Sequence, residues 1–434
     1  MREAQRLAAL AVERVLAGQT LPTALAKLAP AEAGAPGRRR ALVFELAYGT
    51  LRHWGRLEAH VRALATKPIA DPPLRCLVAV ALYQLVHTRA PSFAIVDHAV
   101  NAAATLARPA AKALVNALLR RFLRERDALE LAADADPVAR WSHPRWWIDR
   151  VQREFPADWE TVLASGNAQA PLALRVNRRV TTREALLSAF AEGEIAATPV
   201  GDAGIVVQRA MHPRVLPGFD AGAFAVQDPG AQLAAPLLRP LPGQRVLDAC
   251  AAPGGKATHL AELCNVELVA LDCDESRLER VRENLERLKL ASRRVQVVVG
   301  DAGAPDTWWD GKPFERILAD VPCTATGVVR RHPDVKWLRR EADIEGFAQQ
   351  QSRLLDALWT CLAPGGLMLY ATCSIFEAEN ETPIAAFVER HGDALRETLT
   401  FHPDVARRGA QLLPSLPGAS HNQDGYFYAL LRKR

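Results

Sequence analysis

Several features that would place a protein in a membrane or in an oxidising compartment are missing from this sequence. No apolar run is long enough to span a bilayer. The first residues, MREAQRLAALAVERVLAGQ, spread charges through a helical pattern and lack the apolar stretch of a secretion signal. The seven cysteines include no Cys-x-x-Cys pair, which argues against a metal site. These absences favour a cytoplasmic protein with reduced thiols and no membrane partner.

Two common nucleotide-binding motifs are also missing. The stretch CAAPGGKA only partly matches a phosphate-binding P-loop, because Cys250 and Ala257 stand where that motif needs a glycine and a hydroxyl residue. The dinucleotide fingerprint G-x-G-x-x-G does not occur. A glycine-rich stretch of this kind therefore favours a nucleoside ligand without a pyrophosphate group.

The length and composition predict a folded protein of more than one domain. The chain has 434 residues, of which 49% are hydrophobic and 24% charged, so sizeable cores can form. Positive charge is concentrated in residues 1–130, which hold 19 Lys or Arg and 10 Asp or Glu, while the whole chain has a net charge of +5. The arginines of this segment include two clusters, Arg38, Arg39 and Arg40, and Arg120, Arg121, Arg124 and Arg126. Either these clusters are solvated helix faces, or they contact a polyanion such as nucleic acid.

Periodicity predicts an all-α bundle followed by a small mixed domain. Residues 1–130 show apolar residues at helical spacing, as in ALVFELAYGTLRHWGRLEAHVRAL, and no strand alternation. Residues 131–225 combine a connector helix with a small α+β unit, of the RRM or ferredoxin-like kind. The connector carries Trp141, Trp146 and Trp147, for which packing is favoured over base stacking. The α+β unit carries a basic strand edge that could contact RNA, formed by Arg175, Asn177, Arg178 and Arg179.

The third predicted domain, residues 226–434, alternates apolar runs with helix-like or loop stretches. The five runs are RVLDAC, ELVALDCD, RVQVVVGDA, ERILADVP and GGLMLYATCS. This alternation predicts an α/β, doubly wound, Rossmann-like parallel sheet. The last segments, QLLPS and GYFYALLRKR, predict a terminal hairpin that is added to the sheet.

Ligands in such a sheet bind beyond the carboxyl ends of the strands. The first run leads into the predicted cofactor loop, which consists of Cys250, Ala251, Ala252, Pro253, Gly254, Gly255 and Lys256. Its glycines allow the backbone to approach a ligand closely. Asp272 ends the second run, where an acid can hold ribose hydroxyls, and Asp301 follows the third run. A nucleoside without a pyrophosphate and with these partners points to S-adenosyl-L-methionine.

Two cysteines follow the fourth and fifth runs, in DVPCT at Cys323 and in YATCS at Cys373. Neighbouring parallel strands would bring both to the crevice that holds the cofactor. A thiolate that adds to carbon-6 of a pyrimidine makes carbon-5 nucleophilic enough to accept a methyl group, and the thiol must then be released. One cysteine can attack while the other assists release, and Asp320 is placed to contact the cytosine. Chemistry alone leaves open which cysteine attacks.

The motifs VLDACAAPGGKATHLAE, LDCDESRLERV, DVPCTATGVVRRHPDVKW and YATCSIFEAENE resemble those of the RsmB/Sun (Fmu) family of 16S rRNA cytosine-5 methyltransferases, in the NOL1/NOP2/Sun group. The segments FELAYGTLRHWGRLE and NALLRRFLR are similar to the RNA-binding helical domain of the antitermination factor NusB. The resemblance implies that Cys373 is the nucleophile and that Cys323 assists product release. It also implies that the 250–256 loop, Asp272, Asp301 and Asp320 bind the cofactor.

The chain departs from the family pattern in two places. Where the family usually has Pro-Cys-Ser-Gly-Thr-Gly, this chain has Pro-Cys-Thr-Ala-Thr-Gly, with Ala325 in place of a glycine. The stretch QDPGAQLAA, residues 227–235, has Pro-Gly where serines are common. The first change is expected to stiffen the loop after Cys323. The second change bears on whether residues 227–235 contact the cofactor.

The resemblance predicts a monomeric enzyme that methylates 16S rRNA in an unassembled or early small-subunit state. A tRNA cytosine-5 methyltransferase is an alternative within the same class, and the NusB-like segment favours rRNA. A non-catalytic RNA-binding or antitermination adaptor is an alternative from another class. The intact Cys323, Cys373 and Asp320 argue against an adaptor.

Overall fold

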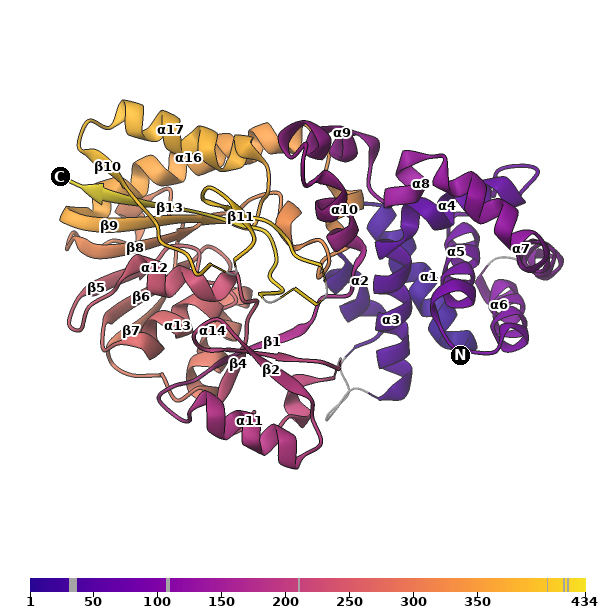
Figure 1. Ribbon diagram of the computed structural model, residues 1–434, viewed down its shortest axis with the longest axis horizontal. Helices are drawn as coiled ribbons and strands as arrows, with labels where there is room; N and C mark the ends of the chain where they lie inside the picture. The colour runs from indigo at the N-terminus through magenta and orange to yellow at the C-terminus, as the bar shows by residue number, and fades with distance from the viewer. Residues whose placement is uncertain (31–36, 107–109, 210, 404, 417, 420) are drawn as a thin grey trace. The chain divides into compact units, whose positions relative to one another are not determined.

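The computed structural model describes all residues except 31–36, 107–109, 210, 404, 417 and 420 (Figure 1). The chain divides into two compact units. The helical unit comprises Met1–Ala168 together with Val329–Glu341, and the sheet unit comprises Gln169–Val328 together with Ala342–Arg434. After Cys323, the chain therefore leaves the sheet unit at Val329 and returns to it at Ala342.

The helical unit confirms the predicted all-α bundle. Its helices are α1 (Arg2–Leu16), α2 (Leu21–Leu28), α3 (Arg38–Arg52), α4 (Trp54–Leu64), α5 (Pro72–His87), α6 (Ser92–Leu106), α7 (Ala111–Asp134), α8 (Pro137–Trp141), α9 (Arg145–Glu154), α10 (Trp159–Asn167) and α15 (Val335–Leu338). Helix α5 is buried along most of its length, so it is apolar on nearly every face. The carboxylate of Asp71 caps its first turn by accepting from the Leu74 amide at 2.9 Å. Among the described residues, no helix has both the length and the apolarity needed to cross a membrane.

The tryptophans of the connector take part in packing, as the sequence favoured. Trp147 is buried among the core side chains of α9. Trp141 lies edge-on to Trp159 with ring centroids 5.3 Å apart, and Trp146 lies 5.4 Å from Trp147. The Trp141–Trp159 contact joins α8 to α10, while Trp146 and Trp147 are neighbours within α9.

The segment Val329–Glu341 packs among the helices by capping two helix ends. The Asp334 carboxylate accepts from the Leu21 amide at 2.9 Å, at the start of α2. At the end of α3, the Trp337 indole donates to the Leu51 carbonyl at 2.7 Å and the Lys336 ammonium donates to the Arg52 carbonyl at 2.8 Å. Helix ends leave backbone amide and carbonyl groups without partners, and the side chains of this segment act as those partners. Its membership in the helical unit was not expected from its place in the sequence.

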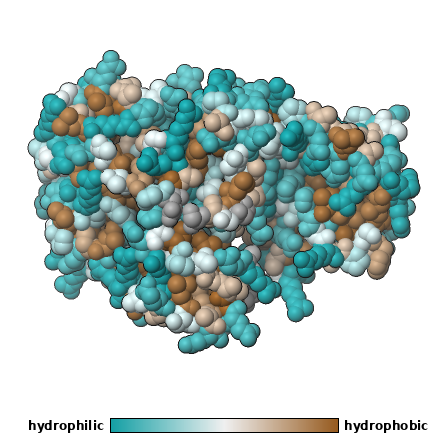
Figure 2. Space-filling view, in the orientation of Figure 1, coloured by the Kyte–Doolittle hydropathy of each residue, from teal (hydrophilic) through white to brown (hydrophobic). Residues whose placement is uncertain are grey.

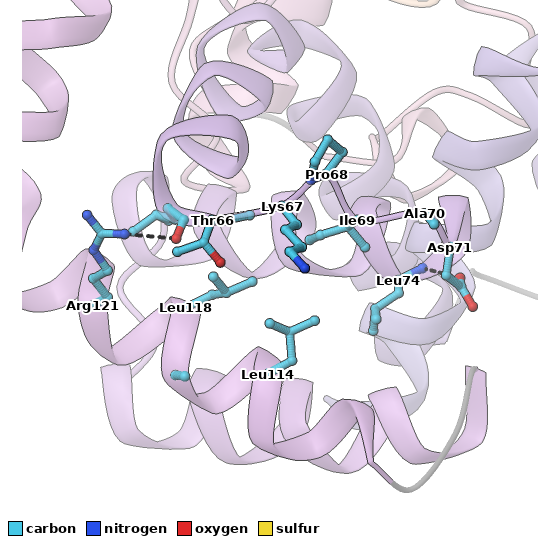
Figure 3. A pocket seen from close by; sticks show the side chains of 13 residues that line it. Thr66, Lys67, Pro68, Ile69, Ala70, Asp71, Leu74, Leu114, Leu118 and Arg121 are labelled. Atoms are coloured by element: carbon cyan, nitrogen blue, oxygen red, sulfur yellow. Dashed lines mark hydrogen bonds between the residues drawn. The ribbon is translucent and has the colours of Figure 1, made fainter.

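A cavity of about 580 Å³ lies in the helical unit between the α4–α5 connection and α7 (Figure 3). Its apolar lining includes Leu64, Ile69, Leu74, Leu114 and Leu118. Arg121 lies at one side and donates to the Leu64 carbonyl at 2.9 Å. None of the predicted site residues lines this cavity.

The sheet unit begins with the small domain, which confirms the predicted α+β unit. Its elements are β1 (Leu172–Val176), α11 (Arg183–Glu192), β2 (Ala197–Val200), β3 (Gly204–Val207) and β4 (Phe224–Val226). The strands form an antiparallel sheet in the order β2-β3-β1-β4. One face of this sheet packs on α11 through apolar side chains such as Leu174, Phe190 and Phe224.

The basic edge predicted on this domain is wrong for two of its four residues. The side chains of Arg175 and Asn177 are fully buried, whereas Arg178 and Arg179 are exposed. Arg175 donates to a Glu262 carboxylate oxygen at 3.2 Å and to the Gly255 carbonyl at 2.7 Å. Its guanidinium therefore fastens β1 to the start of the cofactor loop's helix rather than facing RNA. Burial is tolerated because the ion pair and the hydrogen bonds use its donors.

The large domain confirms the doubly wound sheet. Its elements are α12 (Ala234–Leu238), β5 (Arg245–Asp248), α13 (Gly255–Leu263), β6 (Glu267–Asp272), α14 (Glu275–Arg287), β7 (Val295–Val299), β8 (Phe314–Asp320), α16 (Asp343–Cys361), β9 (Leu362–Thr372), α17 (Glu381–Arg390), β10 (Ala394–Glu397), β11 (Arg407–Arg408), β12 (Gln411–Leu412) and β13 (Tyr426–Lys433). Short 3₁₀ turns occur at Pro213–Val215, Ala231–Leu233, Pro305–Thr307, Thr326–Val328 and Glu377–Glu379.

The strand order is β11-β12-β13-β9-β8-β5-β6-β7, with β10 paired to β13. Strands β5 to β9 are mutually parallel, and β13 joins β9 antiparallel as the expected terminal addition. Helices α12, α13 and α14 cover one face through one apolar core, while α16 and α17 cover the other (Figure 1). The chain reverses its direction of travel across the sheet between β5 and β8, which is where such folds bind ligands.

Candidate active site

The carboxyl ends of the parallel strands bring the predicted polar residues to one edge of the sheet. Asp248 ends β5, Asp272 ends β6 and Asp320 ends β8. Cys373 follows β9 directly. The register pairs Asp320 with Ala371, so the ends of β8 and β9 lie level and the cysteines that follow them can meet.

The predicted cofactor loop turns from β5 into α13. The Ala251 amide donates to the Leu271 carbonyl of β6 at 2.8 Å, and the Gly254 amide donates to the Ala251 carbonyl at 2.7 Å. Gly254 has a φ of +100°, and a Cβ there would lie 3.1 Å from the Val281 backbone of α14. Both the backbone conformation and the close approach require glycine. Helix α13 then begins at Gly255 with its amide groups directed to this edge.

Asp272 is almost fully buried, at 4% exposure, and it organises the loop. One carboxylate oxygen accepts from the Ala252 amide at 3.1 Å, and the other accepts from the Asp274 amide at 3.1 Å. Asp301 lies beyond β7 and is more exposed, with its carboxylate 3.2 Å from the Arg353 guanidinium. The structure thus places Asp272 against the loop and Asp301 at the outer part of the same edge.

Asp248 is a member of this edge that the sequence reasoning missed. Its carboxyl group is buried, and neither oxygen has a hydrogen-bond partner of good geometry among the described residues. Burial raises the pKa of Asp248 to about 8, the negative charges of Asp320 and Asp272 raise it further, and Lys256 opposes them. The sequence did contain a signal, because an acid stands near the end of the apolar run RVLDAC. That run was interpreted only as a strand.

Lys256, the last residue of the loop, forms an ion pair with Asp320 at 2.6 Å. Burial alone would lower the pKa of Lys256, but the Asp320 carboxylate and the nearby Cys373 sulfur raise it, so the ammonium form is retained. The ammonium also lies 5.6 Å from the centre of the Tyr426 ring, which the sequence did not identify. The Lys256 ammonium therefore joins the predicted cofactor loop to the end of β8.

The two predicted cysteines meet, with their sulfur atoms 3.4 Å apart. Cys323 is buried at 8% exposure, and Cys373 is half-buried. The hydrogen bond with Cys373 raises the pKa of Cys323 well above the ordinary thiol value, and burial raises it further. Cys323 therefore remains a thiol and can donate its S–H proton toward the other sulfur.

The residues at this edge fit S-adenosylmethionine. A ribose diol requires acceptors, which the carboxylates of Asp272 and Asp301 offer at the ends of β6 and β7. The cofactor carries a sulfonium and an amino group, both cationic. The buried carboxyl of Asp248, whose pKa among the described residues only Lys256 and the Cys250 backbone lower, is suited to such a neighbour, because a nearby cation favours its ionised form. Within the described residues, no group of His, Cys, Asp and Glu side chains is arranged to hold a metal ion.

A doubly wound sheet with a glycine turn after β5 and acids at the following strand ends defines the class of S-adenosylmethionine-dependent methyltransferases. Comparison with known sequences agrees. The model of the 16S rRNA methyltransferase RsmB/F family matches residues 235–432, that of the RsmF/B-like ferredoxin-like domain matches residues 143–213, and that of the NusB family matches residues 2–124.

Full-length relatives narrow the class. The chain is 44% identical to Ribosomal RNA small subunit methyltransferase B of Pseudomonas putida, over 99% of this chain and 97% of that protein. It is 42% identical to the protein of the same name from Vibrio cholerae, over 92% of this chain and 90% of that protein. The chain belongs to the RsmB/F family of 16S rRNA methyltransferases.

Solved structures agree on the fold. The crystal structure of PH0851 superposes with a TM-score of 0.80 at 25% identity and covers 100% of this chain and 99% of that one. The crystal structure of NSun6 from Pyrococcus horikoshii with SFG has a TM-score of 0.58 at 20% identity and covers 67% of this chain and 98% of that one. This second likeness supports the fold alone. The resemblance that the motifs indicated is confirmed, as is the dependence on S-adenosylmethionine.

Proposed function

We propose that this chain methylates carbon-5 of a cytosine in 16S rRNA through a covalent adduct between Cys373 and carbon-6 of the base. The observation that carries this proposal is the pair of sulfur atoms, 3.4 Å apart at the ends of β8 and β9 and joined to the cofactor loop through Lys256. Two sulfurs at one strand-end edge suit a reaction that forms and then breaks a carbon–sulfur bond.

In this mechanism, Cys373 adds to carbon-6, and the electrons of the carbon-5 to carbon-6 double bond make carbon-5 nucleophilic. The cofactor, when bound, supplies an electrophilic methyl group to carbon-5. The Cys373 sulfur is close enough to Lys256 to raise the pKa of that ammonium, so a positive charge is held beside the attacking sulfur. Asp320 keeps 26% of its side chain exposed, so its carboxylate can accept a hydrogen bond from the cytosine amino group.

Release then needs two events. The carbon-5 proton leaves to a base such as water, and the electrons of that bond re-form the double bond as the carbon-6 to sulfur bond breaks. Cys323 is assigned to this stage, because its thiol is buried beside the departing Cys373 sulfur and can donate its proton to it. The family resemblance assigns the two cysteines in the same way.

The test compares three cysteine variants. Cys373→Ala should form no methylated product and no covalent RNA complex, even with 5-fluorocytosine in the RNA, because nothing attacks carbon-6. Cys323→Ala should attack and methylate and then accumulate a protein–RNA adduct on a denaturing gel. Cys264→Ala, which removes a half-buried thiol at the end of α13, serves as the control and should behave as wild type. An adduct in Cys373→Ala instead would reverse the two roles.

The substrate and partners belong to the same proposal. The relatives are named for the small-subunit ribosomal RNA, and the NusB match covers the basic first segment. We propose that residues 1–130 supply RNA affinity, that residues 131–225 connect this part to the catalytic domain, and that residues 226–434 perform the chemistry. We further propose a cytoplasmic monomer that acts on unassembled or early small-subunit RNA. Bisulfite sequencing of 16S rRNA and tRNA, compared between wild type and a deletion strain, separates this assignment from the tRNA alternative. If the deletion strain lost no methylated cytosine in either RNA, a non-catalytic adaptor would be favoured.

A further inference from the structure

One carboxyl group lies behind both cysteines and is not used by the mechanism above. Glu379 ends the 3₁₀ turn Glu377–Glu379, and its side chain has no exposed surface. One of its oxygens accepts from the Thr324 amide at 2.7 Å, and the other accepts from the Thr324 hydroxyl at 2.5 Å and the Ser374 hydroxyl at 2.6 Å. The shortest hydrogen bonds to this carboxyl group therefore come from the residues that directly follow Cys323 and Cys373.

The contact with Thr324 is reinforced from α16. The Gln351 amide donates to the Pro322 carbonyl at 2.9 Å and approaches the Glu379 carboxyl at 3.4 Å. The residues on both sides of Cys323 are thus held by Glu379 and Gln351 together. Because side-chain hydrogen bonds to backbone groups fix a loop's position, this pair sets where the Cys323 sulfur lies.

The loop of Cys373 has supports of its own. The Thr372 hydroxyl donates to the Asn380 side-chain oxygen at 2.5 Å, and the Asn380 amide donates to the Ser374 carbonyl at 3.0 Å. The Ile375 amide donates to the Thr326 hydroxyl at 3.0 Å, which ties the two loops together, whereas the Asn380 bonds belong to the Cys373 loop alone. Loss of Glu379 would therefore loosen the Cys323 loop more than the Cys373 loop.

We propose that Glu379 is a positioning residue that holds the thiol of Cys323 beside the sulfur of Cys373 and so determines how fast the covalent RNA adduct is released. This inference rests on the covalent mechanism proposed above and adds a residue that the family resemblance did not assign. Among the described residues, Glu379 forms no hydrogen bond with the cofactor loop, so its effect should fall on release and not on cofactor binding.

The electrostatics point the same way. The groups that face the Cys323 thiol are Cys373, Glu379 and Tyr370. The Cys373 hydrogen bond and burial raise the pKa of Cys323 most, and the negative charge of Glu379 raises it further. A carboxylate at this position therefore helps to keep the proton that Cys323 donates.

Two substitutions at this site separate geometry from charge. Glu379→Gln preserves the contacts, because its oxygen can accept from the Thr324 amide while the two hydroxyls rotate to accept from its amide. Glu379→Ala leaves the Thr324 amide buried without a partner. The matched controls are Glu389→Gln and Glu389→Ala, at an exposed carboxylate on α17.

For Glu379→Ala, we expect turnover on 16S rRNA to fall about 10²-fold, the scale for a misplaced group, with unchanged S-adenosylmethionine affinity and an RNA adduct on a denaturing gel. Glu379→Gln should restore turnover and remove the adduct. Rates of Cys323 alkylation by iodoacetamide, followed by mass spectrometry against pH without RNA, should show a lower midpoint in Glu379→Gln than in wild type. Wild-type turnover without adduct in Glu379→Ala would overturn the proposal.

An activity loss accompanied by loss of cofactor binding, or one that Glu379→Gln does not relieve, would equally overturn it, because a merely structural residue behaves in that way. If Glu379→Ala does not fold, Gln351→Ala replaces it, since it removes the support of Pro322 and should also accumulate adduct. No adduct there would count against the proposal. Failure of the proposed function is distinct, because the wild-type enzyme would then form no 5-methylcytosine, whereas the alkylation measurement needs no RNA.

Discussion

The ammonium nitrogen of Lys256 lies 2.6 Å from a carboxylate oxygen of Asp320, and this pair joins the cofactor loop to the strand that leads to Cys323. Lys256 ends the loop after β5, and Asp320 ends β8, which neighbours β5 in the sheet. On the face shown in Figure 2, hydrophilic residues predominate and apolar residues are scattered between them. A cation at this buried edge can act on both Asp320 and the Cys373 sulfur.

Lys256→Met should therefore lower methyl transfer by about 10²–10³-fold, the scale for removing one preorganised electrostatic group. The substitution keeps most of the side-chain volume and removes the charge. Single-turnover methylation of 16S rRNA measures the effect, with Lys312→Met, an exposed lysine of the same unit, as the control. Transfer that is undiminished in Lys256→Met would show that the cation plays no part in the reaction.

Asp272→Ala should weaken S-adenosylmethionine binding by about 1–3 kcal/mol, because both the cofactor and the Ala252 amide lose an acceptor. Calorimetry on the protein without RNA gives the affinity directly. The control is Glu283→Ala, which removes an exposed carboxylate on the adjacent helix α14. An affinity equal to that of wild type would remove Asp272 from the cofactor site.

The sequence was sufficient to predict the doubly wound sheet, because apolar runs alternate with helix-like stretches. It also predicted that Cys323 and Cys373 meet, because residues that follow neighbouring parallel strands lie at one edge of the sheet. It was insufficient for side chains whose role depends on packing between distant segments. Glu379 stands in a run of acids that looks solvated, yet the chain turns it toward Thr324. Arg175 stands among basic residues, yet the second face of its strand is covered by α13, where Glu262 pairs with it.

The segment after Cys323 shows the same limit. The sequence assigned no role to its basic residues, yet Lys336 is fully buried and donates to the Arg52 carbonyl and the Asn167 side chain at 2.8 and 2.7 Å. Burial lowers the pKa of Lys336 well below the ordinary value, and the nearby Arg52 adds to this effect. Only the three-dimensional position of two helix ends could have revealed this use of a lysine.

Ala325 occupies a position that favours glycine, since its φ is +61°. The sequence comparison suggested only a stiffer loop, whereas the structure shows a left-handed residue, which costs about 1–2 kcal/mol for a side chain with a Cβ. Ala325→Gly should therefore raise the unfolding temperature or leave it unchanged, despite the greater flexibility of glycine in the unfolded chain. Thermal unfolding of Ala325→Gly against Ala363→Gly, at a half-buried alanine without this conformation, tests the point. A comparable fall in both variants would contradict it.

The basic cluster on α7 should contribute salt-dependent RNA affinity. Arg120, Arg124 and Arg126 are exposed on this helix, whereas Arg121 is engaged with the Leu64 carbonyl. Changing the three exposed arginines to Gln should weaken RNA binding and reduce its dependence on salt, because fewer counterions are released. S-adenosylmethionine binding should persist.

The matched control for that experiment changes three exposed arginines of the sheet unit to Gln. These are Arg280, Arg293 and Arg294, the last two of which precede β7 at the end of the sheet opposite to the cysteines. Filter binding to a 16S rRNA fragment at several salt concentrations measures both slopes. Equal slopes in the two triple variants would identify the α7 cluster as an ordinary solvated surface.

The buried carboxyl of Asp248 should make stability depend on pH. Its pKa is raised from 3.8 to about 8, mainly by burial, so between these values the folded state holds a proton that the unfolded state has lost. The contribution of this proton to the free energy of unfolding is therefore complete below the pKa of the unfolded chain, 3.8, and disappears as pH rises through about 8. In Asp248→Asn this contribution is absent, because the amide does not titrate. The stability of wild type relative to Asp248→Asn should fall by about 1.4 kcal/mol per pH unit within that interval. Denaturant unfolding of both proteins without cofactor, at several pH values, measures the difference, and a constant difference would mean that Asp248 is ionised in the folded protein.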